Sequence, residues 1–77
     1  MKSNTRDTVI LKAFGEHLKK IRQNKNISQE KLGNLIDVPQ STIGRIERGE
    51  SNPNLCLLVA IAKVLDVDIK NLVDFKA

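Results

Sequence analysis

A pair of short helical patterns on either side of Asp37-Val38-Pro39 restricts the fold of this chain more than any other feature of the sequence. The apolar positions that define the two patterns are Leu32, Leu35 and Ile36 before the break and Ile43 and Ile46 after it. Apolar residues three or four positions apart are typical of α-helices that bury one face. Proline disfavours helical backbone at the residue before it, so the first helix must end ahead of Pro39. The sequence therefore predicts two short helices joined by a tight turn.

The second of these helices is expected from about Gln40 to Arg48, with Gly49 as its stop. Its two isoleucines are its only large apolar residues, so a thin stripe docks and a broad polar face stays exposed. The major groove of DNA is about 12 Å wide and admits one α-helix. A helix that protrudes, anchors on little core surface and offers donors and acceptors outward meets the requirements for entering that groove.

Apolar residues also recur at helical spacing in the rest of the chain, and turn residues divide the whole chain into five segments. We expect an all-α fold, with one domain over residues 7–77 behind a flexible arm of residues 1–6. The other helices are expected over about 7–25, 29–36, 55–65 and 69–73. Candidate N-caps are Asp7, Ser28, Asn54 and Asp68, and Asn26 is a candidate left-handed stop.

Positive charge is concentrated in the first third of the chain. The net charge is +4, and residues 1–26 carry seven basic against two acidic side chains. Residues 27–49 are neutral overall, and residues 50–77 carry a net charge of −1. A basic first third favours a polyanionic partner, and the alternative is a solvated basic helix face.

Several classes of function find no support in the residues. Cys56 is the only cysteine, which excludes an intramolecular disulfide and suits a reducing cytoplasm. No apolar run approaches the ~20 residues of a membrane span. The single histidine, His17, has no second ligand at metal-site spacing, and no nucleophile–base pair or glycine-rich phosphate loop is found. We therefore expect a cytoplasmic protein without membrane partner, enzymatic activity, metal, cofactor or small-molecule ligand, with His17 on its surface.

The segment Ser28–Gly49 resembles the helix-turn-helix of the Cro/lambda-repressor-like (XRE-type) DNA-binding family. Similarity extends over about residues 11–74, upstream at Phe14-Gly15 and Ile21-Arg22 and downstream at Asn52-Pro53, Leu58, Ile61-Ala62, Leu65, Val67 and Leu72. The resemblance implies a compact five-helix bundle in which residues of about 40–48 form the recognition helix. Three positions depart from the family: Gly33 replaces the usual alanine, Asp37 the usual turn glycine and Pro39 the usual polar cap. At Gly33 we expect the close approach of another helix.

The resemblance also implies roles for individual residues in binding double-stranded DNA. Base readout falls to Gln40, Ser41, Thr42, Gly44 and Arg45, near the N-terminal end or on the exposed side of the recognition helix. Gln40 is suited to adenine N6 and N7, and Arg45 to guanine O6 and N7. Phosphate contacts fall to Gln29, Ser28, Arg48, Asn52, Asn54 and Arg22, and a structural ion pair to Arg22 and Glu47. The alternative is that these polar residues are ordinary surface side chains.

A second apolar stripe along residues 55–65 predicts a partner surface. The core stripe is expected at Leu55, Leu58, Ile61, Ala62 and Leu65. Outside it lie Cys56, Leu57, Ala60 and Val64, and Val73 and Phe75 follow near the C-terminal end. An apolar stripe outside the core is typical of an interface, so we expect a two-fold homodimer with recognition helices one DNA turn apart. The alternative is a monomer whose tail folds over the stripe.

Together these features predict a sequence-specific regulator of transcription, of bacterial or phage type, that reads a near-palindromic operator as a dimer. We expect a repressor or autoregulator. An antitoxin, a restriction–modification controller, or a protein-interaction module that has lost DNA binding are the alternatives. The polar residues Gln40, Ser41 and Arg45 on a basic chain argue against the last of these.

Overall fold

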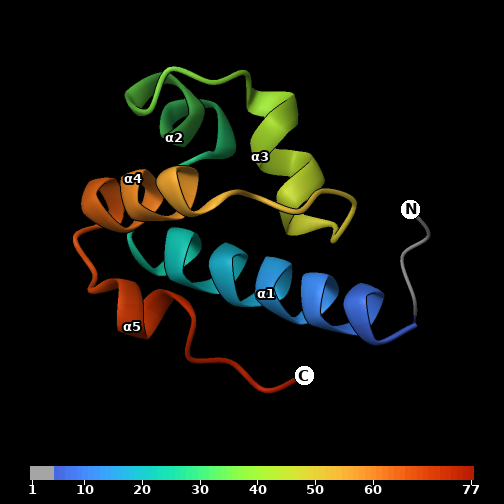
Figure 1. Cartoon of the computed structure of the whole chain (residues 1–77). Coiled ribbons are helices and arrows are strands. Elements are labelled where there is room, and N and C mark those ends of the chain that lie inside the picture. Colours follow the sequence, from blue (N-terminus) through green and yellow to red (C-terminus); the bar gives the residue numbers. More distant parts are fainter. Residues whose placement is uncertain (1–4) are drawn as a thin grey trace.

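The computed structural model describes residues 5–77, which fold into five α-helices without a strand among them (Figure 1). The helices are α1 (Thr5–Asn24), α2 (Gln29–Leu35), α3 (Gln40–Glu47), α4 (Leu55–Leu65) and α5 (Ile69–Leu72). The prediction of an all-α fold is confirmed. α1 begins at Thr5, two residues before the expected start, and residues 1–4 of the expected arm lie outside the described residues.

Side chains cap two of the helices where the sequence predicts. At the start of α2, Ser28 Oγ accepts the backbone N–H three residues on at 3.0 Å. At the start of α4, Asn54 Oδ1 accepts the corresponding N–H at 2.8 Å. The other two expected caps differ, because Asp7 lies within the first turn of α1 and the Asp68 side chain makes no capping bond to α5. These contacts set where α2 and α4 begin.

The turn between α2 and α3 passes through a left-handed residue, Asp37, with φ of 60°. The Val38 N–H donates to the Gly33 carbonyl oxygen at 2.9 Å. A Cβ at Gly33 would lie only 2.6 Å from the Val38 carbonyl oxygen. Gly33 therefore accommodates the backbone of the turn and, as expected, the close approach of another helix, because the backbone nitrogen of Gln40 at the start of α3 would lie 3.4 Å from that Cβ. Pro39 occupies the N-cap of α3 without a side-chain capping bond.

One apolar core joins all five helices. In Figure 1, α1 lies between α3 on one side and α5 on the other, and α2 packs against α3 and α4. The buried apolar side chains are Phe14, Leu18, Leu32, Ile43, Ile46, Ile61, Ala62, Leu65 and Leu72. Because every helix contributes to this list, α3 rests on a scaffold built from the whole described chain.

α1 and α3 meet at two glycines, one in α1 and one just past the end of α3. A Cβ at Gly15 would collide with the carbonyl oxygens of Ile46 and Glu47. Gly49 has φ of 76°, and a Cβ there would lie 2.6 Å from Lys12 Cγ and 2.9 Å from the backbone of that residue. With no side chain between them, the two backbones approach closely and fix the position of α3 on α1.

Two large apolar side chains that were expected on buried helix faces are exposed. The exposed fractions are 69% for Leu55 and 54% for Leu35. Leu55 lies seven residues before the buried Ala62 and so on nearly the same face of α4, but it is the first residue of the helix and is exposed at that end. The expectation that Leu55 belongs to the core stripe is therefore wrong.

The residues after α5 fold back onto α1. The ring centroid of Phe75 lies 5.8 Å from that of Phe14 and 6.1 Å from that of His17. His17 Nε2 lies 2.8 Å from the Asn71 carbonyl oxygen, within hydrogen-bond distance. His17 is therefore a partly exposed residue at the surface, and its ring contacts α5 and the residues that follow it.

Candidate nucleic-acid interface

α3 lies at the edge of the molecule and presents one face to the core (Figure 1). Ile43 and Ile46 are almost completely buried on that face. Among the residues predicted for base readout, Gln40, Ser41 and Arg45 are exposed, Thr42 is half-buried and Gly44 is buried. The helix therefore keeps a polar surface in solvent while two isoleucines hold it to the scaffold.

A buried ion pair ties the C-terminal half of α3 to α1. Arg22 Nε donates to Glu47 Oε2 at 2.6 Å and Nη2 donates to Oε1 at 2.9 Å, a bidentate arrangement. Both side chains are more than nine-tenths buried. The hydrogen bond to Glu47 raises the pKa of Arg22, against the opposing effect of burial. These are the two residues for which the resemblance implied a pair, and they position α3.

A glutamine extends this ion pair to the first residue of α3. Gln29 Nε2 donates to Glu47 Oε1 at 2.9 Å, and Gln40 Nε2 donates to Gln29 Oε1 at 3.4 Å. The side chain predicted to hold a phosphate is thus engaged by α3 in the structure. Its contact with Glu47 has no signature in the sequence, because the two residues are 18 positions apart and only the packing of α2 on α3 joins them.

Gly44 is buried, which corrects the expectation that it lies open on the exposed side of α3. A Cβ at this position would lie 3.0 Å from Arg48 Nη1 and 3.6 Å from Gln29 Oε1. Two long side chains from neighbouring positions therefore cover the helix backbone here. The missing Cβ makes a notch for the Arg48 guanidinium rather than an open path to the backbone.

Arg48 is held over this notch by Glu50, a residue that the sequence analysis did not single out. Arg48 Nε donates to Glu50 Oε2 at 2.9 Å, and Nη2 donates to Oε1 at 3.3 Å. The hydrogen bond from Arg48 lowers the pKa of the Glu50 carboxyl, and the charge of Arg45 lowers it further. Glu50 therefore places a charged carboxylate beside Arg48, just past the end of α3.

The remaining residues predicted to contact phosphate differ in what they can offer. Ser28 and Asn54 accept backbone N–H groups in their caps, which leaves the serine hydroxyl proton and the asparagine amide group as donors. Asn52 is exposed between α3 and α4. Arg22 is only 7% exposed and uses all three of its nitrogens within the protein, so it offers little to a phosphate.

The residues predicted for a dimer interface do not share one exposed face. Cys56 and Val73 are exposed and Ala60 is half-buried, whereas Leu57, Val64 and Phe75 pack against the core. The second stripe of α4 is thus in part a continuation of the core, because α2 as well as α5 packs against this helix. The large apolar side chains left exposed in and after α4 and α5 are Leu55, Ile69 and Val73.

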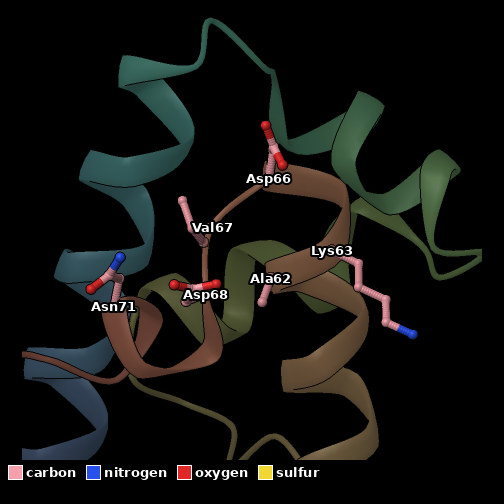
Figure 2. Close-up of a pocket in the computed structure, with 6 residues that line it drawn as sticks. All are labelled: Ala62, Lys63, Asp66, Val67, Asp68 and Asn71. Atoms are coloured by element: carbon pink, nitrogen blue, oxygen red, sulfur yellow. The ribbon is translucent and has the colours of Figure 1, made fainter.

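Neither a metal centre nor a membrane-spanning helix is found within residues 5–77. No group of three or more His, Cys, Asp or Glu side chains there is arranged to hold a metal ion, and none of the described helices is long and apolar enough to cross a membrane. An open pocket between α4 and α5 is lined by Ala62, Lys63, Asp66, Val67, Asp68 and Asn71 (Figure 2). None of these residues belongs to α2 or α3, so the pocket is separate from the candidate interface.

Comparisons with known proteins agree with this geometry. Residues 18–72 match the family model described as Helix-turn-helix (HTH_3). The chain is similar to the control protein C.BamHI of Bacillus amyloliquefaciens, with 43% identity over 63 residues that cover 80% of this chain and 78% of that protein. It is similar in structure to the restriction-modification controller protein C.AhdI from Aeromonas hydrophila, with 35% identity and a TM-score of 0.78 over 80% of this chain and 94% of that one. The P22 c2 repressor, solved in complex with a synthetic operator, matches with 31% identity and a TM-score of 0.72 over 79% and 92% of the two chains.

Proposed function

The chain belongs to the helix-turn-helix family, and we propose that it regulates transcription by binding a specific sequence of double-stranded DNA through α3. The placement of α3 carries this proposal, because two buried isoleucines anchor the helix and its polar residues face solvent. A recognition helix of this form enters the major groove with its N-terminal residues toward the base edges. Similarity to two controller proteins and a repressor bound to its operator supports the same conclusion.

Two exposed residues of α3 have the chemistry to distinguish base pairs. The planar guanidinium of Arg45 matches the O6 and N7 acceptors of guanine. Gln40 directs one amide N–H toward Gln29, which leaves its second N–H for adenine N7 and its carbonyl oxygen for the N6 amino group. Gln29 therefore orients Gln40 for readout. We assign the hydroxyls of Ser41 and Thr42 to neighbouring base edges or phosphates.

Donors on both sides of α3 are placed to position the helix on the DNA backbone. We assign the Ser28 hydroxyl, the Asn52 and Asn54 amides and the Arg48 guanidinium to phosphates. Gln29 contributes its remaining amide N–H. Arg22 is left out of this set, because its contacts are internal and its role is to hold α3.

We further assign the regulator a homodimeric form on a near-palindromic operator. Leu55 and Val73 expose apolar surface, and Val73 lines an apolar groove with Leu58 and Ile10. Removing such surface from water contributes about 25 cal/mol for each Å² buried. We place the interface at the exposed residues Leu55, Cys56, Ile69 and Val73 and leave out Leu57 and Val64. A two-fold axis there would set two recognition helices about 34–36 Å apart, one turn of DNA.

Selection of bound sequences from random duplex DNA tests specificity and symmetry together. We expect a short consensus in two inverted halves, about one helical turn apart. Arg45→Ala should weaken binding to the selected operator by about 1–3 kcal/mol and lose preference at one base pair of each half. Lys70→Ala is the matched control, since it removes the same charge from α5, on the other side of α1 from α3. Equal losses in the two variants would contradict base readout by Arg45.

Similarity to C.BamHI and C.AhdI favours a narrower role, control of restriction–modification genes. A selected operator found upstream of such genes would support that role.

A protein-interaction module without DNA binding is the opposing candidate. If the chain neutralises phosphates, its affinity for any DNA duplex should fall steeply as the salt concentration rises. A parent protein that binds no duplex DNA would contradict the proposed function. We place this regulator in the cytoplasm with the DNA.

A further inference from the structure

Glu50 puts a negative charge on the face that meets DNA in the proposed function. Its carboxylate binds Arg48 through two hydrogen bonds of 2.9 and 3.3 Å, and the two side chains are 54% and 59% exposed. Ion pairs with this much exposure add little to the stability of a folded protein. A carboxylate on this face also repels the phosphates of an approaching duplex. Folding stability therefore gives no reason for Glu50 at this position.

Arg48 packs against the backbone of α3 in addition to its ion pair with Glu50. Its Nη1 lies 3.0 Å from the place that a Cβ of Gly44 would occupy, so the guanidinium fills the notch left by the missing side chain. The backbone N–H of Glu50 donates to the Arg45 carbonyl oxygen at 2.9 Å, which fixes Glu50 at the end of α3. The notch and the carboxylate are separate features, and together they hold Arg48 against α3 with its charge neutralised.

We infer that Glu50 occupies Arg48 in place of a DNA phosphate, so that Arg48 adds to DNA affinity only where a phosphate displaces the carboxylate. This inference rests on the proposed function. Carboxylate and phosphate both accept a planar guanidinium through two parallel hydrogen bonds, so the exchange replaces one bidentate pair with another. No hydrogen bond of Arg48 is lost when it moves from the protein to the DNA.

The exchange makes Glu50 a specificity-determining residue. Binding to non-operator DNA depends on neutralising phosphates, and an arginine that is already neutralised contributes little to it. When α3 is seated in the groove of the operator, Arg48 faces the backbone at short range and exchanges its partner. Glu50 therefore weakens non-operator binding more than operator binding and widens the ratio between them.

Glu50→Gln tests this inference with little change of shape. The backbone N–H of residue 50 still donates to the Arg45 carbonyl oxygen, a bond of 2.9 Å in the parent. Affinity for non-operator duplex should rise roughly three- to tenfold, and the slope of log affinity against log salt should steepen by about 0.9. Operator affinity should rise less, so the specificity ratio falls. Asp68→Asn changes the net charge equally at the start of α5, far from α3, and should leave both affinities and the slope close to the parent's.

A double-mutant cycle with Arg48→Gln gives the decisive measurement. In the parent, Arg48→Gln should lower non-operator affinity by less than about twofold, because Glu50 already neutralises Arg48. In the Glu50→Gln background the same change should lower it roughly three- to tenfold. The inference would be overturned if Arg48→Gln lowered non-operator affinity equally in both backgrounds, or if Glu50→Gln and Asp68→Asn had the same affinities and salt slopes. DNA binding by the parent would still support the proposed function in that case. A parent that binds no duplex at all overturns both.

Discussion

The two halves of this molecule are held together by different kinds of contact. Around α2 and α3, polar and directional contacts are added to the apolar core, with the bidentate pair of Arg22 and Glu47 extended by Gln29. Around α4, α5 and the C-terminal residues the contacts are mainly apolar, as in the packing of Phe75 on Phe14 with ring centroids 5.8 Å apart. The first half carries the candidate interface, and the second closes the core and leaves apolar side chains exposed.

The difference between directional and apolar contacts corresponds to how precisely the helices of each half must be positioned. Apolar burial is non-directional, so it stabilises a helix without fixing its rotation. A bidentate hydrogen-bonded pair works in one geometry only. A helix that reads base edges needs a fixed rotation and position, because a displaced donor loses its acceptor. We therefore expect substitutions in the polar half to disturb both stability and DNA binding, and substitutions in the apolar half to cost stability in proportion to burial.

Glu47→Ala should give the largest effect. It leaves the Arg22 guanidinium buried without its carboxylate and removes the acceptor of the Gln29 amide. Breaking a buried ion pair in this way costs about 3–5 kcal/mol, a large part of the stability of a small domain. The free energy of unfolding from urea denaturation measures the loss, and operator affinity should fall with it because α3 loses its position.

The matched variants separate charge from packing. Arg22→Met combined with Glu47→Leu removes both charges and should recover most of the lost stability, because apolar residues of similar size replace buried ion pairs at little cost. Glu50→Ala breaks the exposed pair and should leave the unfolding curve unchanged. If Glu47→Ala changed the free energy of unfolding as little as Glu50→Ala, the position of α2 and α3 would not depend on the buried ion pair.

Gly15→Ala should have the next largest effect. A Cβ at Gly15 meets carbonyl oxygens of the α3 backbone, which cannot move aside as the end of a side chain can. We expect a loss of about 2–3 kcal/mol, measured by urea denaturation, as for other overpacked sites. Gly44→Ala is the contrasting control, since its Cβ meets mainly the flexible end of Arg48 and gains about 1 kcal/mol of helix propensity. A loss at Gly44 as large as that at Gly15 would contradict the close backbone approach.

Much of the polar half is predictable from the sequence because its signals are local. Ser28 caps α2 through an N–H three residues away, and Asp37 takes the left-handed backbone that the turn requires. The ion pair of Arg22 and Glu47 joins residues 25 positions apart, and only the family resemblance predicted it. The bond between Gln29 and Glu47 was out of reach, because tertiary packing alone brings these side chains together.

Surface accessibility was the least predictable property in both halves. Gly44 was expected in the open, but the side chains that cover it reach it from other positions, one of them in α2. Glu50 was passed over because it lies beyond the helix stop, where only the folded chain shows its contact with Arg48. In α4 almost every residue is apolar, so spacing cannot separate the exposed Leu55 from the half-buried Leu57.

Phe75→Ala should destabilise the apolar half by about 1–2 kcal/mol. A fully buried ring costs about 3–5 kcal/mol when truncated, and Phe75 is only half-buried. Its contacts with Phe14 and His17 account for part of the loss, since aromatic pairs contribute about 0.5–1.5 kcal/mol beyond burial. Lys76→Ala, at the exposed next position, should leave the urea midpoint unchanged. An equally small change at Phe75 would mean that the C-terminal residues do not dock on α1.

Leu55→Ala should have the smallest effect on the folded monomer and the most selective effect on association. Because Leu55 is mostly exposed, its truncation should change the free energy of unfolding by less than about 0.5 kcal/mol in dilute protein, whereas Leu57→Ala should cost about 1–2 kcal/mol because Leu57 packs against the core. At tens of micromolar the order should reverse in sedimentation equilibrium, with Leu55→Ala weakening self-association and Leu57→Ala leaving it close to the parent's. If Leu55→Ala left self-association unchanged, or if the parent remained monomeric, the proposed dimer interface on α4 would be wrong.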